Sequence, residues 1–174
     1  MMEKKNVHIM YGFITGIVMV ITSLIIYITD ISFKPGGEKT IYVVYLPFLV
    51  GIISNSMAYS KANNSFVTFG NIFGSCFKAT MIIILVMIGW GIISSVVFPE
   101  MKEKTLRKIQ ETLMKSQKMT DEQIDAYMSF MTKHWNTIVI GGTVLYNLFF
   151  GAIFSLIGGL AAKKNAVQPT ADNF

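Results

Sequence analysis

Lys78 is the residue whose type and position most suggest chemistry. It lies about two turns inside a long apolar run, where ionisable side chains are rare and usually functional. An ammonium group there can hold an anionic lipid headgroup or a partner, or relay a proton. We favour a simpler interpretation, in which the long side chain extends to the headgroups. Coupled transport usually needs an intramembrane carboxylate or similar relay, and the middles of the apolar runs contain no Asp, Glu, His or Arg.

The two histidines and the single cysteine are the other candidates for chemistry. His8 precedes the first apolar run and His134 precedes the last, so they are expected at opposite membrane faces and cannot form an axial haem pair. Cys76 has no nearby histidine, and neither a zinc motif nor a phosphate-binding or nucleophile loop occurs. We therefore expect no metal site, no cofactor and no enzymatic activity.

Four separated apolar runs must position these residues. Each is long enough to cross a bilayer, because a helix rises ~1.5 Å per residue and the hydrocarbon core is roughly 30 Å thick. In lipid the backbone must satisfy its own hydrogen bonds, so the runs are predicted to be helices. The fold class is therefore an all-α membrane protein with four transmembrane helices, at Ile9–Thr29, Ile41–Tyr59, Ile72–Phe98 and Ile138–Ala162.

Composition agrees with this assignment. The 174 residues are 52% hydrophobic and only 14% charged, so a soluble core could not hide four such helices. The net charge of +5 is scattered over span ends and one mixed-charge loop rather than gathered in a basic stripe. We expect membrane lipids, and not nucleic acid, to be the partner of these charges.

The polar stretch 100–136 between the third and fourth runs is predicted to be an amphipathic helical hairpin outside the membrane. Thr120 and Gln123 form a capping box that begins its second helix. The apolar face of that helix contains Ile124, Tyr127, Met128 and Met131. This face either rests on the membrane surface, which we favour, or docks a partner. We assign residues 1–164 to one transmembrane domain and 165–174 to a short polar tail.

Small residues recur at four-residue spacing on three of the spans. Such residues let helices approach closely in lipid, either within the bundle, which we favour, or against a partner chain. Asn147, near the middle of the last span, is expected to hydrogen-bond another helix. The small residues are Gly12 and Gly16, Gly70 and Gly74, and Gly151, Ser155 and Gly159.

Trp90 lies between two glycines, too deep for an interfacial aromatic belt. Its indole N–H needs an acceptor. Packing inside the bundle is favoured over a place in the wall of a ligand pocket.

The third run and its flanks resemble a known family. The stretch Ser65-Phe66-Val67-Thr68-Phe69-Gly70 is followed by Phe73 and Phe77-Lys78, and Pro99, a helical polar loop and a glycine-rich last span come later. In this order the features are similar to the membrane-protein family called domain of unknown function 4199, found largely in Bacteroidota. The resemblance implies a four-span cytoplasmic-membrane protein and assigns no reaction or ligand.

The function predicted from these features is a non-enzymatic scaffold or accessory subunit that binds other integral membrane proteins. A small-molecule or ion conduit is the alternative, and a lipid-interacting enzyme is the third. Lysine and arginine counts, nine on the hairpin side against five or six on the other, favour termini outside the cell. We still predict both termini in the cytoplasm, because the Lys4-Lys5 pair directly before the first span resists translocation.

Overall fold

The computed structural model describes residues 6–34 and 36–165, and this part of the chain is helical without a strand. Two short 3-10 turns, Ile31–Phe33 and Gly37–Lys39, connect the first two helices. The α-helices are α1 (Val7–Ile28), α2 (Thr40–Ala62), α3 (Phe69–Val97), α4 (Pro99–Ser116), α5 (Asp121–Lys133) and α6 (Trp135–Ala161).

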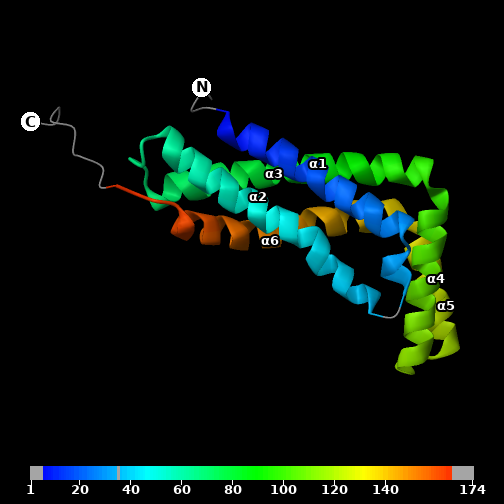
Figure 1. Cartoon of the computed structure of the whole chain (residues 1–174). Coiled ribbons are helices and arrows are strands. Elements are labelled where there is room, and N and C mark those ends of the chain that lie inside the picture. The colour runs from blue at the N-terminus through cyan, green and yellow to red at the C-terminus, as the bar shows by residue number, and fades with distance from the viewer. Residues whose placement is uncertain (1–5, 35, 166–174) are drawn as a thin grey trace, which may run out of the picture.

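Helices α1, α2, α3 and α6 are long and apolar enough to cross a membrane, which confirms the predicted fold class. Each predicted span matches one of them, with ends that differ by at most three residues. Helix α1 packs against α2 and α3, and α6 packs against the same two helices. Figure 1 shows the resulting bundle, with α1 beginning and α6 ending at the same end.

Many small and polar side chains are buried in the bundle, and many large apolar ones are exposed on its outside. Asn55 of α2, Thr80 of α3 and Ser155 of α6 are fully buried. In contrast, Leu85 is 68% exposed and Leu145 is 70% exposed. Because lipid is as apolar as leucine, close packing and interhelical hydrogen bonds hold such helices together. This arrangement suits a protein whose outer surface contacts lipid.

A cluster of buried apolar side chains occupies the centre of the bundle. Most of its members belong to α2 and α3, and α1 contributes Met19. The largest members are Met19, Phe48, Ile52, Ile72 and Ile83. Phe48 makes an edge-to-face contact with Phe154 of α6, with ring centroids 5.2 Å apart. The cluster therefore joins all four spans.

The hairpin predicted between the third and fourth spans is present as α4 and α5. Pro99 begins α4, where its missing N–H costs no helical hydrogen bond, and Gln117 ends it in the left-handed conformation. Thr120 and Gln123 form the predicted capping box at the start of α5. In Figure 1 both helices turn away from the bundle and run across its end.

The opposite end of the bundle is closed by the segment after α6. The Ser60 hydroxyl donates a hydrogen bond to the Lys163 carbonyl, and the Asn165 N–H donates to the Ser65 carbonyl at 2.7 Å. The Lys164 ammonium donates to the Gly159 carbonyl at 2.6 Å. Of the polar tail predicted at 165–174, residues 166–174 lie outside the described residues.

Candidate functional site

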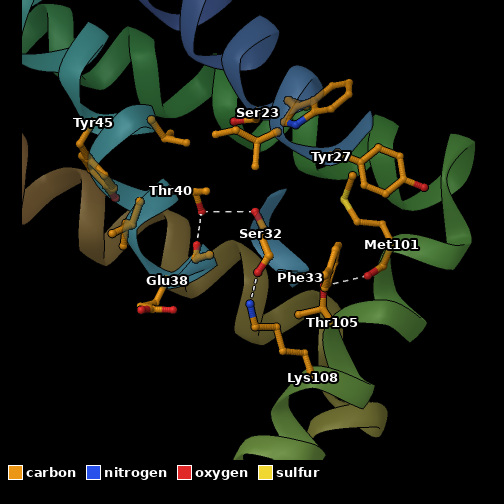
Figure 2. Close-up of a pocket in the computed structure, with 15 residues that line it drawn as sticks. Ser23, Tyr27, Ser32, Phe33, Glu38, Thr40, Tyr45, Met101, Thr105 and Lys108 are labelled. Carbon is orange, nitrogen blue, oxygen red and sulfur yellow. Dashed lines mark hydrogen bonds between the residues drawn. The ribbon is translucent and has the colours of Figure 1, made fainter. Parts of the chain in front are cut away.

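An open cavity of about 420 Å³ lies at the hairpin end of the bundle. Its walls come from the end of α1, the turns after it, the start of α2, Trp90 of α3 and the first part of α4. Figure 2 shows Tyr27 and Phe33 on one side and Tyr45 on another, with Lys108 at the lower rim. The lining is mainly apolar, with hydroxyls at Ser23, Ser32, Thr40 and Thr105.

Helix α4 is fastened to the turn after α1 by two lysines. The Lys108 ammonium donates to the Ser32 carbonyl, and the Lys104 ammonium lies 2.9 Å from the Asp30 carboxylate. Lys104 and Lys108 also lie over the Phe33 ring, 5.8 and 5.7 Å from its centroid. We call this set of contacts the clamp. It holds α4 across the mouth of the cavity, although the half-exposed Asp30–Lys104 pair alone is worth only about 0–1 kcal/mol.

A further contact joins α1 directly to the first turn of α4. The Tyr27 hydroxyl donates a hydrogen bond to the Glu100 carboxylate, and the Tyr27 ring packs against Phe98, with centroids 5.2 Å apart. This hydrogen bond lowers the pKa of Glu100 below its ordinary value, because it stabilises the charged carboxylate. The hairpin is thus tied to α1 at a second point.

A second opening of about 350 Å³ adjoins the cavity along α4. Phe33 and Lys108 line both openings. All other residues that line the second opening are charged, namely Asp30, Lys34, Lys104, Arg107 and Glu111. We call it the basic cleft, because four cations line it against two carboxylates.

Elsewhere in the bundle the helices approach one another closely at glycines. A β-carbon added to Gly12 would lie 2.8 Å from the Ala79 carbonyl oxygen, and one added to Gly16 would lie 2.8 Å from Val86 Cβ. One added to Gly51 would lie 2.0 Å from Thr15 Oγ1. Only glycine permits these helix approaches. Gly12, Gly16 and Gly51 thus let α1 pack closely on α3 and α2.

The structure places the last-span stripe against the chain's own helices. Gly151 faces Thr80, and Gly159 faces Phe69 of α3. Ser155, between them on the same stripe, is fully buried. Of the two interpretations left open by the sequence, packing within the bundle is therefore the one seen here. Gly12 and Gly16 play the same part between α1 and α3.

Gly70 and Gly74 differ from the other small-residue pairs. The nearest atom to a β-carbon added at Gly70 would be the hydroxyl of Thr68, at 3.9 Å, and Gly74 has nothing within 4 Å. This pair leaves a shallow strip on the outer face of α3. Phe69, Phe73 and Phe77 form a stacked aromatic ladder along the same helix, with centroids 6.2 and 5.9 Å apart.

Asn147 does not bond another helix, so that prediction was wrong. Its amide donates to the Thr143 carbonyl one turn back on α6, and its Oδ1 atom has no partner among the described residues. The interhelical amide is instead Asn55, which donates to Ser75 Oγ at 3.3 Å and to Cys76 Sγ at 3.4 Å. Asn55 lies in the middle of α2, where the sequence reasoning had singled out no polar residue.

Lys78 is exposed on the surface of α3, away from the cavity. It lies nine residues after the start of the helix, about 13 Å along its axis. No hydrogen bond or ion pair of its ammonium is found among the described residues. Its position is compatible with a side chain that reaches toward the headgroups.

The predicted docking face of the hairpin is divided in two. Ile124 is 2% exposed and Met131 is 9% exposed, where α5 packs against α4 and the start of α6. Met128 is half-buried, and Tyr127 is exposed. A partner on α5 would therefore meet Tyr127 and its exposed neighbour Phe130, not the whole predicted stripe.

Trp90 lines the cavity, although packing inside the bundle had been favoured. It also packs against Phe98, with ring centroids 6.3 Å apart. Gly89 and Gly91, which flank Trp90, were the sequence feature that could have indicated open space there. In the structure, a β-carbon added to either glycine would meet nothing within 4 Å.

The sequence also gave no indication of the clamp residues Ser32, Lys104 and Lys108. Ser32 and Lys108 are 76 positions apart, and a contact over that separation leaves no local pattern.

The described residues contain no group of three or more His, Cys, Asp or Glu side chains placed to hold a metal ion. No curated protein and no solved structure matches the chain. A family match extends over residues 10–164, which includes the four spans and the hairpin. By this match the chain belongs to the family described as protein of unknown function (DUF4199).

Proposed function

We propose that this integral membrane protein is a non-enzymatic scaffold or accessory subunit of a larger complex in a bacterial cytoplasmic membrane. The clamp carries the proposal, because it makes the hairpin a fixed platform rather than a loose loop. Met114, Tyr127 and Phe130 are exposed on this platform. Large apolar side chains outside the spans are costly in water and favour contact with a partner or with the membrane surface.

The strip at Gly70 and Gly74 supports the same proposal from within the membrane. Close approach of backbones at small residues is the usual basis of helix association in lipid. Since no helix among the described residues covers this strip, another integral membrane protein is the partner it suits. Membrane lipids cover the remaining apolar surface.

A conduit is the alternative, and the cavity is the observation that favours it. The close helix contacts at Gly12, Gly51 and Gly151 favour a closed bundle over a conduit, because an added β-carbon would have no room there. A conduit would require α1 or α6 to separate from α2 and α3. A subunit that holds its bundle closed requires no such movement.

The proposal places both termini in the cytoplasm and the hairpin on the outer side. A cysteine at Thr112, an exposed residue of α4, tests this in a Cys76→Ser background. In whole spheroplasts an impermeant thiol reagent should label Thr112→Cys. If the reagent labels this cysteine only after the membrane is opened, the orientation is the opposite of the one proposed.

Affinity purification in mild detergent, followed by mass spectrometry, tests the subunit role. A stoichiometric partner should co-purify with the wild type and be lost from Tyr127→Glu and Phe130→Glu. Ser129→Glu, an equal charge change at an exposed neighbour, is the matched control and should keep the partner. Ile124, Gly151 and Ser155 are unsuitable, since changes there disturb the chain's own packing. A monodisperse wild type that never retains a partner would contradict the proposal.

A further inference from the structure

The cavity and the basic cleft together have the character of a site for an amphiphile. They adjoin at Phe33 and Lys108, which line both. The cavity is mainly apolar, whereas the cleft is charged, so the two neighbouring openings place an apolar wall beside a charged one. The site lies where α1 ends and α4 begins, at the level where the spans end.

The charges of the cleft determine whether the polar group of a bound amphiphile should be an anion or a cation. Asp30 is already paired with Lys104 at 2.9 Å. Lys34 and Lys108 donate to the backbone carbonyls of Thr29 and Ser32, which uses one N–H of each ammonium without cancelling its charge. The cleft therefore keeps an excess of positive charge and favours an anion.

Glu103 reduces this excess from two positive charges to one without reversing its sign. Glu103 lies 3.9 Å from Arg107, one turn back on α4, and both side chains are largely exposed. Glu111 is the second carboxylate of the cleft. In Figure 2 the carboxylate of Glu38 lies on the side of the cavity away from Phe33. The excess is thus concentrated between the turn after α1 and α4.

The apolar part of the site offers room for acyl chains. A third groove, about 380 Å³ in volume and almost wholly apolar, adjoins the cavity at Ile41 and Tyr45 and runs between α2 and α6. Both spaces flank the first third of α2, in which Pro47 lacks a backbone N–H. The indole N–H of Trp90, which lines the cavity, has no acceptor among the described residues and suits an ester carbonyl.

We infer that the cavity and the basic cleft bind one anionic phospholipid of the surrounding bilayer. Its phosphate lies in the cleft beside Arg107 and Lys108, and its acyl chains lie in the cavity and along α2. This site is separate from Lys78, which is on the outer surface of α3. It is also independent of the subunit role, since a lone chain could hold the lipid equally well.

Native mass spectrometry of the delipidated full chain tests the site. Phosphatidylglycerol should bind in preference to phosphatidylcholine with the same acyl chains. Arg107→Gln should lower this preference about fivefold, the effect of one basic residue near an anionic lipid. Lys115→Gln, the same charge change on α4 outside the cleft, should leave it unchanged. Arg107 takes no part in the clamp, so its loss should not release the hairpin.

A second variant tests the apolar part. Ile26→Trp, which adds bulk to the cavity wall, should weaken the binding of both lipids while the protein stays monodisperse. Equal binding of the two lipids by the wild type would overturn the inference, as would identical phosphatidylglycerol binding in Arg107→Gln and Lys115→Gln. If soluble glycerol phosphate displaced the lipid, the cleft would be a free-phosphate site and the lipid assignment would be wrong.

Discussion

Gly151 of α6 packs directly on Thr80 of α3, so closely that a β-carbon added to the glycine would lie 2.2 Å from Thr80 Cγ2. Thr80 is β-branched and fully buried, and its hydroxyl donates to the Cys76 carbonyl at 3.2 Å. It has little freedom to move aside. The contact therefore sets the distance between α3 and α6.

Gly151→Ala should destabilise the bundle by roughly 1–3 kcal/mol, the usual cost of overpacking a core. Gly142→Ala on the same helix is the matched control, because nothing lies within 4 Å of its added β-carbon. That change should be neutral or stabilising by up to about 1 kcal/mol, since alanine is the better helix former. Thermal unfolding in detergent compares the two variants. Equal melting temperatures would show that α3 and α6 are not in close contact here.

Lys78→Met should leave the stability of the bundle within about 0.5 kcal/mol of the wild type, because the side chain is exposed and pairs with no described residue. Lys78→Arg should be silent in every assay. The lipids and proteins that co-purify with each variant provide the readout. Loss of one of them from Lys78→Met alone would reveal a recognition role for this ammonium.

Thr120→Ala should loosen the start of α5, because Thr120 accepts a hydrogen bond from the Gln123 N–H and Gln123 Oε1 accepts one from the Thr120 N–H. Loss of such a cap costs about 1 kcal/mol. Hydrogen exchange of the first α5 amides should rise accordingly. Thr112→Ala on α4, where the hydroxyl only bonds the Lys108 carbonyl of its own helix, is the control.

Contact between α1 and α4 should weaken in acid. The pKa of Glu100 is lowered in the folded state, so its bond with Tyr27 stabilises the protein above the ordinary carboxyl pKa of 4.5. This contribution is lost as the pH falls from 4.5 through the lowered value. Hydrogen exchange at the start of α4 should therefore accelerate over that range in the wild type. Tyr27→Phe should remove the dependence, and an unchanged profile in this variant would assign it to another group.

Features encoded in short stretches of sequence were predictable. The four apolar runs gave spans within three residues of their observed ends, and the capping box at Thr120 marked the start of α5. Gly12 and Gly16 pack between helices as their spacing indicated. In each case the signal and the structure lie within a few turns of the same helix.

Contacts between distant segments were not predictable in this way. Gly51 packs on Thr15, yet Gly51 has no small partner four residues away and so lacked a motif. Four-residue spacing also could not distinguish a face that is covered, such as Gly151–Gly159, from one left open, such as Gly70–Gly74. Five separate segments of the chain line the cavity, and its position depends on how α4 crosses the end of the bundle.

A cross-link between Ser32 and Thr105 tests whether the clamp fixes the hairpin against the end of α1. Both residues line the cavity, and replacing them leaves Lys104 and Lys108 in place. They are changed to cysteine in a Cys76→Ser background, and a short bifunctional maleimide is added to the protein in its membrane. We expect rapid and nearly complete intramolecular linkage of Ser32→Cys with Thr105→Cys. Ser32→Cys with Thr112→Cys, two turns further along α4, should link far more slowly. Equal, slow linkage of both pairs would mean that the hairpin moves freely and that the clamp does not hold it.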